Sequence, residues 1–170
     1  MTHAPPTPEA LELLRRSARL RVDAQGRWWH EGEPFTNERL AALFSRGLGW
    51  RAREGGGLLD GEATLTVGAQ WCYVECDRTP FLVTRLAAEG APAALWATLN
   101  TEARAEVRAA WLEGEVLFVA LHGAAPAARL SRHAQARCAE WLEEREGLLA
   151  LRVGERLLPV EGAPPAPASP

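Results

Sequence analysis

The sequence contains no lysine, because all 19 of its basic residues are arginine. Without lysine the chain has neither the lysine of a phosphate-binding loop nor one that forms a Schiff base with a carbonyl substrate. Cysteine is scarce as well, with 3 residues. An odd number of cysteines in a chain with no export signal predicts reduced thiols, no disulfide and a cytoplasmic location.

Long apolar runs and clusters of positive charge are also missing. No segment approaches the roughly 18 continuous apolar residues of a membrane-spanning helix, and residues 1–6 lack the basic and apolar parts of a signal peptide. The net charge is −3, and the arginines are scattered among 22 acidic residues. No stretch is built to attract a phosphate backbone, so we expect neither nucleic acid nor a membrane as a partner.

Length and composition predict a small globular protein. With 170 residues, 47% of them hydrophobic, the chain is long enough for one domain or for two small subdomains that share a core. The proline-rich ends, residues 1–8 and 163–170, are predicted to be disordered. A segment of low complexity around residues 87–92 divides the rest into an N-terminal subdomain, residues 9–88, and a C-terminal subdomain, residues 89–162.

The N-terminal half predicts two helices and several strands. One helix begins at Glu9 and ends before Leu20, and a hairpin follows, with Gly26 in its turn at a positive φ. Thr36 is the predicted N-cap of a second helix that ends near residue 48. Its apolar spacing predicts a buried stripe of Leu40, Leu43, Phe44 and Leu48. Three strands then follow as an antiparallel meander, over residues 62–67, 70–76 and 81–86.

The C-terminal half is also rich in strands. After a strand over residues 95–100, residues 101–112 suit either a helix or a strand, and we favour the strand. Ser131 caps a predicted helix that ends near Arg145. Residues 148–153 and 156–160 form a hairpin on Gly154-Glu155, a pair suited to a type II′ turn. Strands with one packed helix in each half indicate the α+β class, with two small β-rich subdomains.

Several blocks of residues occur at a distinctive spacing. They are Gly26-Arg27-Trp28, His30, Gly32, Pro34-Phe35, Leu43-Phe44, Val74-Glu75, Asp77 and Pro80-Phe81-Leu82-Val83. In these blocks the chain resembles the bacterial family called domain of unknown function 1285, and the resemblance extends over nearly all of the chain outside its ends. It implies the two β-rich subdomains and favours the strand at Val107. Because the family has no established activity or cofactor, it implies no mechanism.

Few residues suggest catalysis or metal binding. Cys72 and Cys76 are four residues apart in a predicted strand, which separates them by about 13 Å, too far for two ligands of one zinc ion. We therefore expect no metal and no cofactor. The pair that suits nucleophilic catalysis is Cys76 with His30, if neighbouring strands bring them together, and a small thiol enzyme is the alternative function.

The aromatic residues are the unusual feature of this sequence. Trp28 and Trp29 are consecutive, while Trp71 and Tyr73 share one face of a predicted strand with Glu75, so a single sheet face cannot bury them all. We favour a non-enzymatic binding or regulatory module with an aromatic-lined site where the subdomains meet. The candidate residues for binding a small molecule or a protein are Trp28, His30, Trp71, Tyr73 and Glu75. Self-association through exposed strand edges is a third interpretation.

Overall fold

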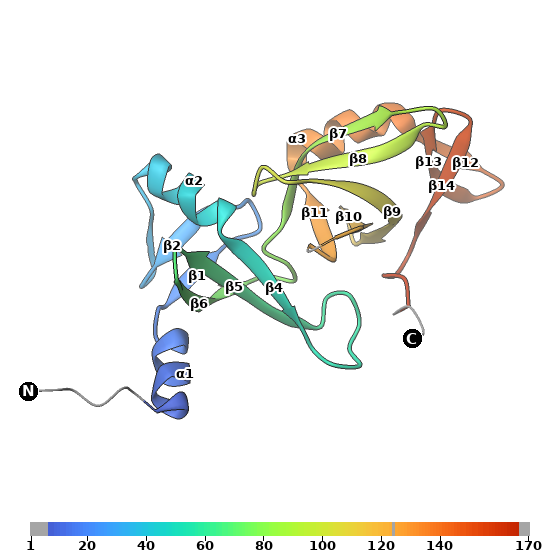
Figure 1. The fold of residues 1–170 in the computed structure, drawn as a ribbon. Coiled ribbons are helices and arrows are strands. Elements are labelled where there is room, and N and C mark those ends of the chain that lie inside the picture. Colours follow the sequence, from blue (N-terminus) through green and yellow to red (C-terminus); the bar gives the residue numbers. More distant parts are fainter. Residues whose placement is uncertain (1–6, 124, 167–170) are drawn as a thin grey trace, which may run out of the picture.

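The computed structural model describes residues 7–123 and 125–166, which form two β-sheets and three α-helices (Figure 1). The predicted α+β class, rich in strands, is confirmed. Of the ends predicted to be disordered, residues 1–6 and 167–170 lie outside the described residues, whereas Thr7 caps the first helix and Pro8 begins it. Among the described residues, no helix is long and apolar enough to cross a bilayer.

The N-terminal sheet has six strands in the order β3-β2-β1-β6-β5-β4. They are β1 (Leu20–Val22), β2 (Trp28–His30), β3 (Glu33–Pro34), β4 (Leu48–Ala52), β5 (Gly61–Val67) and β6 (Gln70–Cys76). The predicted hairpin is confirmed as β1 and β2, and Gly26 in its turn has a φ of 77°. β1 also pairs in parallel with β6, which joins this hairpin to the β4-β5-β6 meander.

One face of the six-stranded sheet is buried because its strands alternate. Leu20, Val22, Trp28 and Val74 point to this inner face, and Phe44 of α2 packs on it. The ring of Trp28 is 2% exposed, and its Nε1 donates a hydrogen bond of 3.0 Å to the Ser45 hydroxyl. The opposite, outer face carries Trp29 of β2 and Trp71, Tyr73 and Glu75 of β6.

The C-terminal sheet has eight strands in the order β10-β11-β7-β8-β9-β14-β13-β12, and β10 also pairs with β9. The strands β7 to β11 therefore close into a small barrel. These strands are β7 (Leu82–Glu89), β8 (Ala94–Leu99), β9 (Arg104–Glu113), β10 (Val116–Leu121) and β11 (Ala127–Leu130), and β12 (Leu142–Arg145), β13 (Leu148–Val153) and β14 (Arg156–Glu161) extend the sheet. The strand interpretation of residues 101–112 is confirmed by β9, and the last hairpin by β13 and β14. Gly154 has a positive φ and Glu155 does not, as a type II′ turn requires.

The sequence pattern placed residues 81–86 in the first meander, and this prediction is wrong for β7. It pairs with β8 and with β11, so the chain passes from one sheet to the other between Cys76 and Leu82. The predicted boundary after residue 88 falls within this strand. An alternating pattern predicts which face a residue occupies, but it does not specify the neighbouring strand.

The helices are α1 (Pro8–Arg16), α2 (Glu38–Arg46) and α3 (Arg132–Cys138). Asn37, rather than the predicted Thr36, caps α2, because its side-chain oxygen accepts a hydrogen bond of 3.1 Å from the Leu40 amide. This helix ends at Arg46, and the next apolar residues begin β4. The predicted stripe is therefore wrong in part: Leu40 and Leu43 are 38% and 43% exposed.

Ser131 caps α3 as predicted, but the helix ends at Cys138 and not near Arg145. A short 3-10 turn, η1 (Ala139–Trp141), leads directly into β12. Residues 142–145 pair antiparallel with β13, and this ladder of hydrogen bonds overrides the helical spacing of the preceding apolar residues. Propensity is a weak guide wherever tertiary pairing is available.

We predict that the cap of α2 can be distinguished by two neighbouring substitutions. Asn37→Ala removes an acceptor from the first turn and lowers the free energy of unfolding by about 1 kcal/mol. Thr36→Ala removes a hydroxyl that makes no side-chain hydrogen bond to the described residues, so it changes stability by less than about 0.5 kcal/mol. Urea denaturation of both variants measures the difference, and the reverse order would restore Thr36 as the cap.

Candidate functional site

The structure separates the five predicted site residues onto two faces of the six-stranded sheet. Trp28 is buried in the core on the inner face, so it cannot contact a ligand without unfolding. His30 lies two residues after Trp28 in β2, so it is on the same side of the sheet, but it is exposed. Trp71, Tyr73 and Glu75 alternate along β6 and lie together on the outer face, as the sequence pattern predicted.

The rings of Trp71 and Tyr73 hold α1 on the outer face. They contact each other edge to face, with their centroids 5.2 Å apart. The guanidinium groups of Arg15 and Arg16 lie 4.0 Å from the centroids of Trp71 and Tyr73, respectively. Arg51 of β4 approaches the same two rings, at 5.1 and 5.8 Å. Three arginines thus already contact the two rings. The rings therefore do not form the free surface between the two sheets that the sequence analysis predicted.

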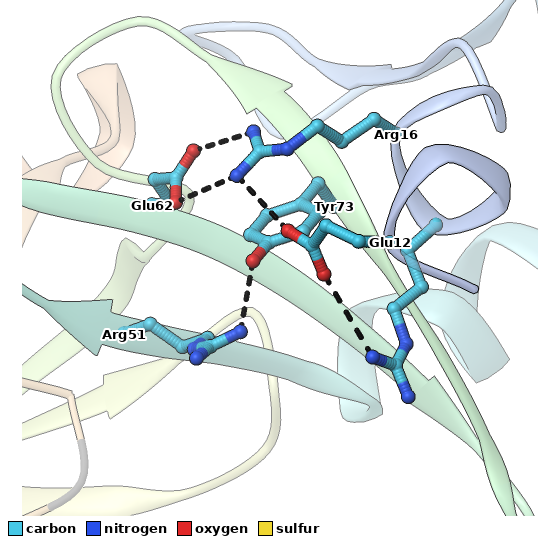
Figure 2. A network of polar contacts seen from close by, with 6 residues as sticks. Glu12, Arg16, Arg51, Glu62 and Tyr73 are labelled. Carbon is cyan, nitrogen blue, oxygen red and sulfur yellow. Dashed lines mark hydrogen bonds and ion pairs between the residues drawn. The ribbon is translucent and has the colours of Figure 1, made fainter. Parts of the chain in front are cut away.

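Ion pairs complete the attachment of α1. Figure 2 shows the Arg16 guanidinium between the carboxylates of Glu12 and Glu62, with hydrogen bonds of 2.8 and 3.4 Å to Glu62. The Tyr73 hydroxyl accepts a hydrogen bond of 2.8 Å from Arg51. The hydrogen bond from Arg16 lowers the pKa of the Glu62 carboxyl, which is therefore ionised at neutral pH.

α1 buries none of its nine residues. Its polar side faces the sheet, and Leu13 and Leu14 remain 71% and 62% exposed. Charged and cation–π contacts, rather than apolar packing, therefore attach the helix to β6. Beside it, hollows of about 520 and 500 Å³ share Arg19 and Glu75 along the outer face.

A larger hollow of about 870 Å³ lies where the two halves meet, and the sequence analysis did not predict it. The turn between β1 and β2 contributes Ala24 and Gln25 to its wall. The barrel contributes Leu82, Val116, Arg129 and Leu130, and one side of α3 contributes Arg132, Gln135 and Ala136. The hollow therefore combines apolar residues with two arginines, and it needs both halves of the chain to exist.

Gln135 holds α3 against the barrel at this hollow. Its amide donates a hydrogen bond of 2.6 Å to the Glu115 carbonyl and accepts one of 3.1 Å from the Leu117 amide. On the other side, the turn of the first hairpin approaches the barrel so closely that a Cβ at Gly26 would lie 3.2 Å from Leu82. Hydrogen bonds and close packing thus position both walls before any ligand arrives.

The structure does not bring Cys76 and His30 together. β1 lies between their strands, so their backbones are two strand spacings, about 10 Å, apart. Burial and, to a smaller extent, the neighbouring Asp77 carboxylate raise the pKa of the Cys76 thiol to about 11. Burial also raises the pKa of Cys72, and that of Cys138 to about 11. These thiols are protonated at neutral pH, the opposite of what a nucleophile requires.

The described residues contain no group of three or more His, Cys, Asp or Glu side chains that could hold a metal ion. The aspartates act within turns instead. In the turn of the first hairpin, Asp23 accepts hydrogen bonds from the Gln25 and Arg27 amides and from Trp29 Nε1. Partial burial alone raises the pKa of the Asp23 carboxyl, but these hydrogen bonds outweigh it and lower the pKa below its usual value.

Comparison with solved structures confirms the predicted resemblance at the level of the fold. A DUF1285 family protein from Silicibacter pomeroyi DSS-3 aligns with a TM-score of 0.61 at 19% sequence identity, covering 93% of this chain and 88% of that one. A second, from Shewanella baltica OS155, aligns with a TM-score of 0.53 at 15% identity, covering 73% of this chain and 92% of that one. No protein-family model and no curated protein matches the sequence. The comparisons thus supply an architecture and no specific activity.

Replacing Trp71 should loosen α1 without unfolding the sheet. Trp71→Ala removes the ring beneath Arg15, so hydrogen exchange of residues 8–16 becomes faster, while the free energy of global unfolding falls by about 1 kcal/mol. Trp96→Ala is the matched control, because Trp96 also lies near an arginine but belongs to β8. Unchanged protection of α1 in Trp71→Ala would contradict its role in holding the helix.

The thiols should react slowly with iodoacetamide. With its pKa at about 11 instead of 9.0, Cys76 carries about a hundredfold less thiolate at pH 7 than an exposed cysteine. Peptide mapping of the alkylated protein measures the rate, and the same protein in denaturant is the control. A native Cys76 that reacts as fast as the unfolded one would revive the thiol enzyme.

Proposed function

We propose that this protein is a cytoplasmic bacterial binding module whose ligand occupies the junction hollow, defined by Ala24, Leu82, Arg129, Arg132 and Ala136. The proposal depends on one observation: a hollow of about 870 Å³ built from both halves of the chain. Pockets between substructures that combine apolar walls with a few polar groups are the usual sites for small ligands. The three cysteines are free thiols, in keeping with the proposed compartment.

Binding rather than catalysis is favoured by the groups present. His133 lines the hollow, but the described cysteines lie elsewhere and have raised pKa values. Ser131 is the hydroxyl on the wall, and its Oγ accepts a hydrogen bond of 3.1 Å from the Ala134 amide as the cap of α3. A nucleophile needs a base within hydrogen-bond reach, and no such hydrogen bond is formed by these side chains among the described residues.

The outer face of the six-stranded sheet fits this function less well. The rings of Trp71 and Tyr73 on this face already contact α1 and Arg51. The two hollows beside them are smaller in volume than the junction hollow. Their lining residues all belong to one half of the chain, between residues 16 and 76. Trp71 and Tyr73 therefore serve the attachment of α1, and the junction hollow replaces them as the candidate site.

A side chain that fills the junction hollow should abolish binding there. Ala136 is exposed on α3 and lines the hollow, so Ala136→Trp places an indole in the ligand's position. Ala42→Trp, on an exposed position of α2, is the matched control. The fluorescent probe anilinonaphthalene sulfonate should bind the wild type and the control equally and Ala136→Trp about tenfold more weakly.

Native mass spectrometry of the protein purified gently from its own cells provides a second readout. A retained small molecule should appear with the wild type and with Ala42→Trp and be absent with Ala136→Trp. If filling the hollow changes neither probe binding nor the retained mass, the junction hollow is not the binding site.

A further inference from the structure

Arg129 is a charged residue held largely out of water at the junction hollow. It lies in β11, where it pairs with Phe118 of the neighbouring strand β10 and with Leu82 of the neighbouring strand β7. Its side chain is 14% exposed, and its guanidinium carbon is 5.8 Å from the centroid of the Phe118 ring. A confined cation needs acceptors, because burial removes the water that would otherwise solvate it.

Within the described part of the chain, Arg129 has few such acceptors. Its closest carboxylate oxygen belongs to Asp77, 3.9 Å from Nη1, which is longer than a hydrogen bond, and the Asp77 side chain is 65% exposed. The Arg129 Nε is buried and has no hydrogen-bond acceptor there. The guanidinium therefore retains unused donor capacity beside the hollow.

The other charges around the hollow leave an excess of positive groups. Arg132, on the first turn of α3, lines the hollow with Arg129, and Glu115 is the carboxylate on its wall. Glu113 lies nearby, but Arg78 binds it through two hydrogen bonds of 3.0 and 2.5 Å. Among the residues that line the hollow, an incoming negative group therefore meets two guanidinium groups and one carboxylate; Asp77, which is near Arg129, lies outside this lining.

We propose that the junction hollow binds a small organic anion: a carboxylate that Arg129 and Arg132 hold, with an aliphatic part against Leu82 and Val116. This inference rests on the proposed function and specifies the class of its ligand. A planar guanidinium can donate two parallel hydrogen bonds to a carboxylate, and such charge-assisted bonds are strong where water is excluded. The apolar wall adds affinity in proportion to the hydrocarbon area it covers.

Octanoate and octan-1-ol, probes of equal chain length, separate the charge from the apolar contact. Isothermal titration calorimetry on the full chain should show octanoate binding at least about tenfold more tightly than octan-1-ol. Arg129→Gln should reduce this preference about tenfold, and Arg132→Gln, which alters an exposed side chain and leaves the fold intact, about threefold. Arg137→Gln, on the opposite side of the same helix, is the matched control and should leave the preference unchanged.

Three outcomes would overturn the inference: equal affinity for the two probes, no octanoate binding at millimolar concentration, or an equal loss in Arg132→Gln and Arg137→Gln. Its failure can be distinguished from that of the proposed function. If both probes bind with equal affinity and Ala136→Trp abolishes both, the hollow is the site but its ligand is not an anion. If octanoate binds equally well to Ala136→Trp, the site itself lies elsewhere.

Discussion

The ring of Trp50 connects the two halves of the molecule, because it packs against the cores of both sheets. The ring is held in place within its own sheet, because a Cβ at Gly61 of β5 would lie 2.7 Å from the indole and 2.5 Å from the Arg51 carbonyl, so this position requires glycine. β4 is one edge of the six-stranded sheet, and the turn at Gly26 approaches the barrel from the other side. Leu48, Leu58 and Leu59 add further apolar contacts with the barrel, and the junction hollow opens beside the turn at Gly26.

Features encoded by neighbouring residues could be predicted from the sequence. The hairpins at Gly26 and Gly154 depend on a local φ, and the cap at Ser131 depends on one side chain. Features that depend on distant pairing could not. β7 had the pattern of a strand, but its place in the barrel depends on β8 and β11. The segment that follows α3 becomes β12 because β13 pairs with it.

The candidate site shows the same division. Alternation correctly placed Trp71, Tyr73 and Glu75 on one face of β6, but it could not show that α1, some sixty residues away in the chain, covers the two rings with arginines. Arg129 carried a signal that was available: a charged residue within an otherwise apolar strand, Ala127–Leu130. A buried polar residue is more informative than another aromatic one, because burying it needs a reason.

The proposed binding at the junction hollow would link a ligand to the arrangement of the two halves. Besides Trp50 and the turn at Gly26, the halves are joined by Leu48, which packs against both cores, by Leu58 and Leu59, which pack against the cluster of Trp111 and Phe118, and by exposed ion pairs such as Arg46 with Glu102. Such pairs contribute about 0–1 kcal/mol each. A ligand that contacts both the first hairpin and α3 is bound only when the halves are in place, and at a hundred times its dissociation constant it stabilises that arrangement by about 2.7 kcal/mol. The ligand would then contribute more to the junction than any one of these ion pairs, which suits a module that reports the presence of a small molecule.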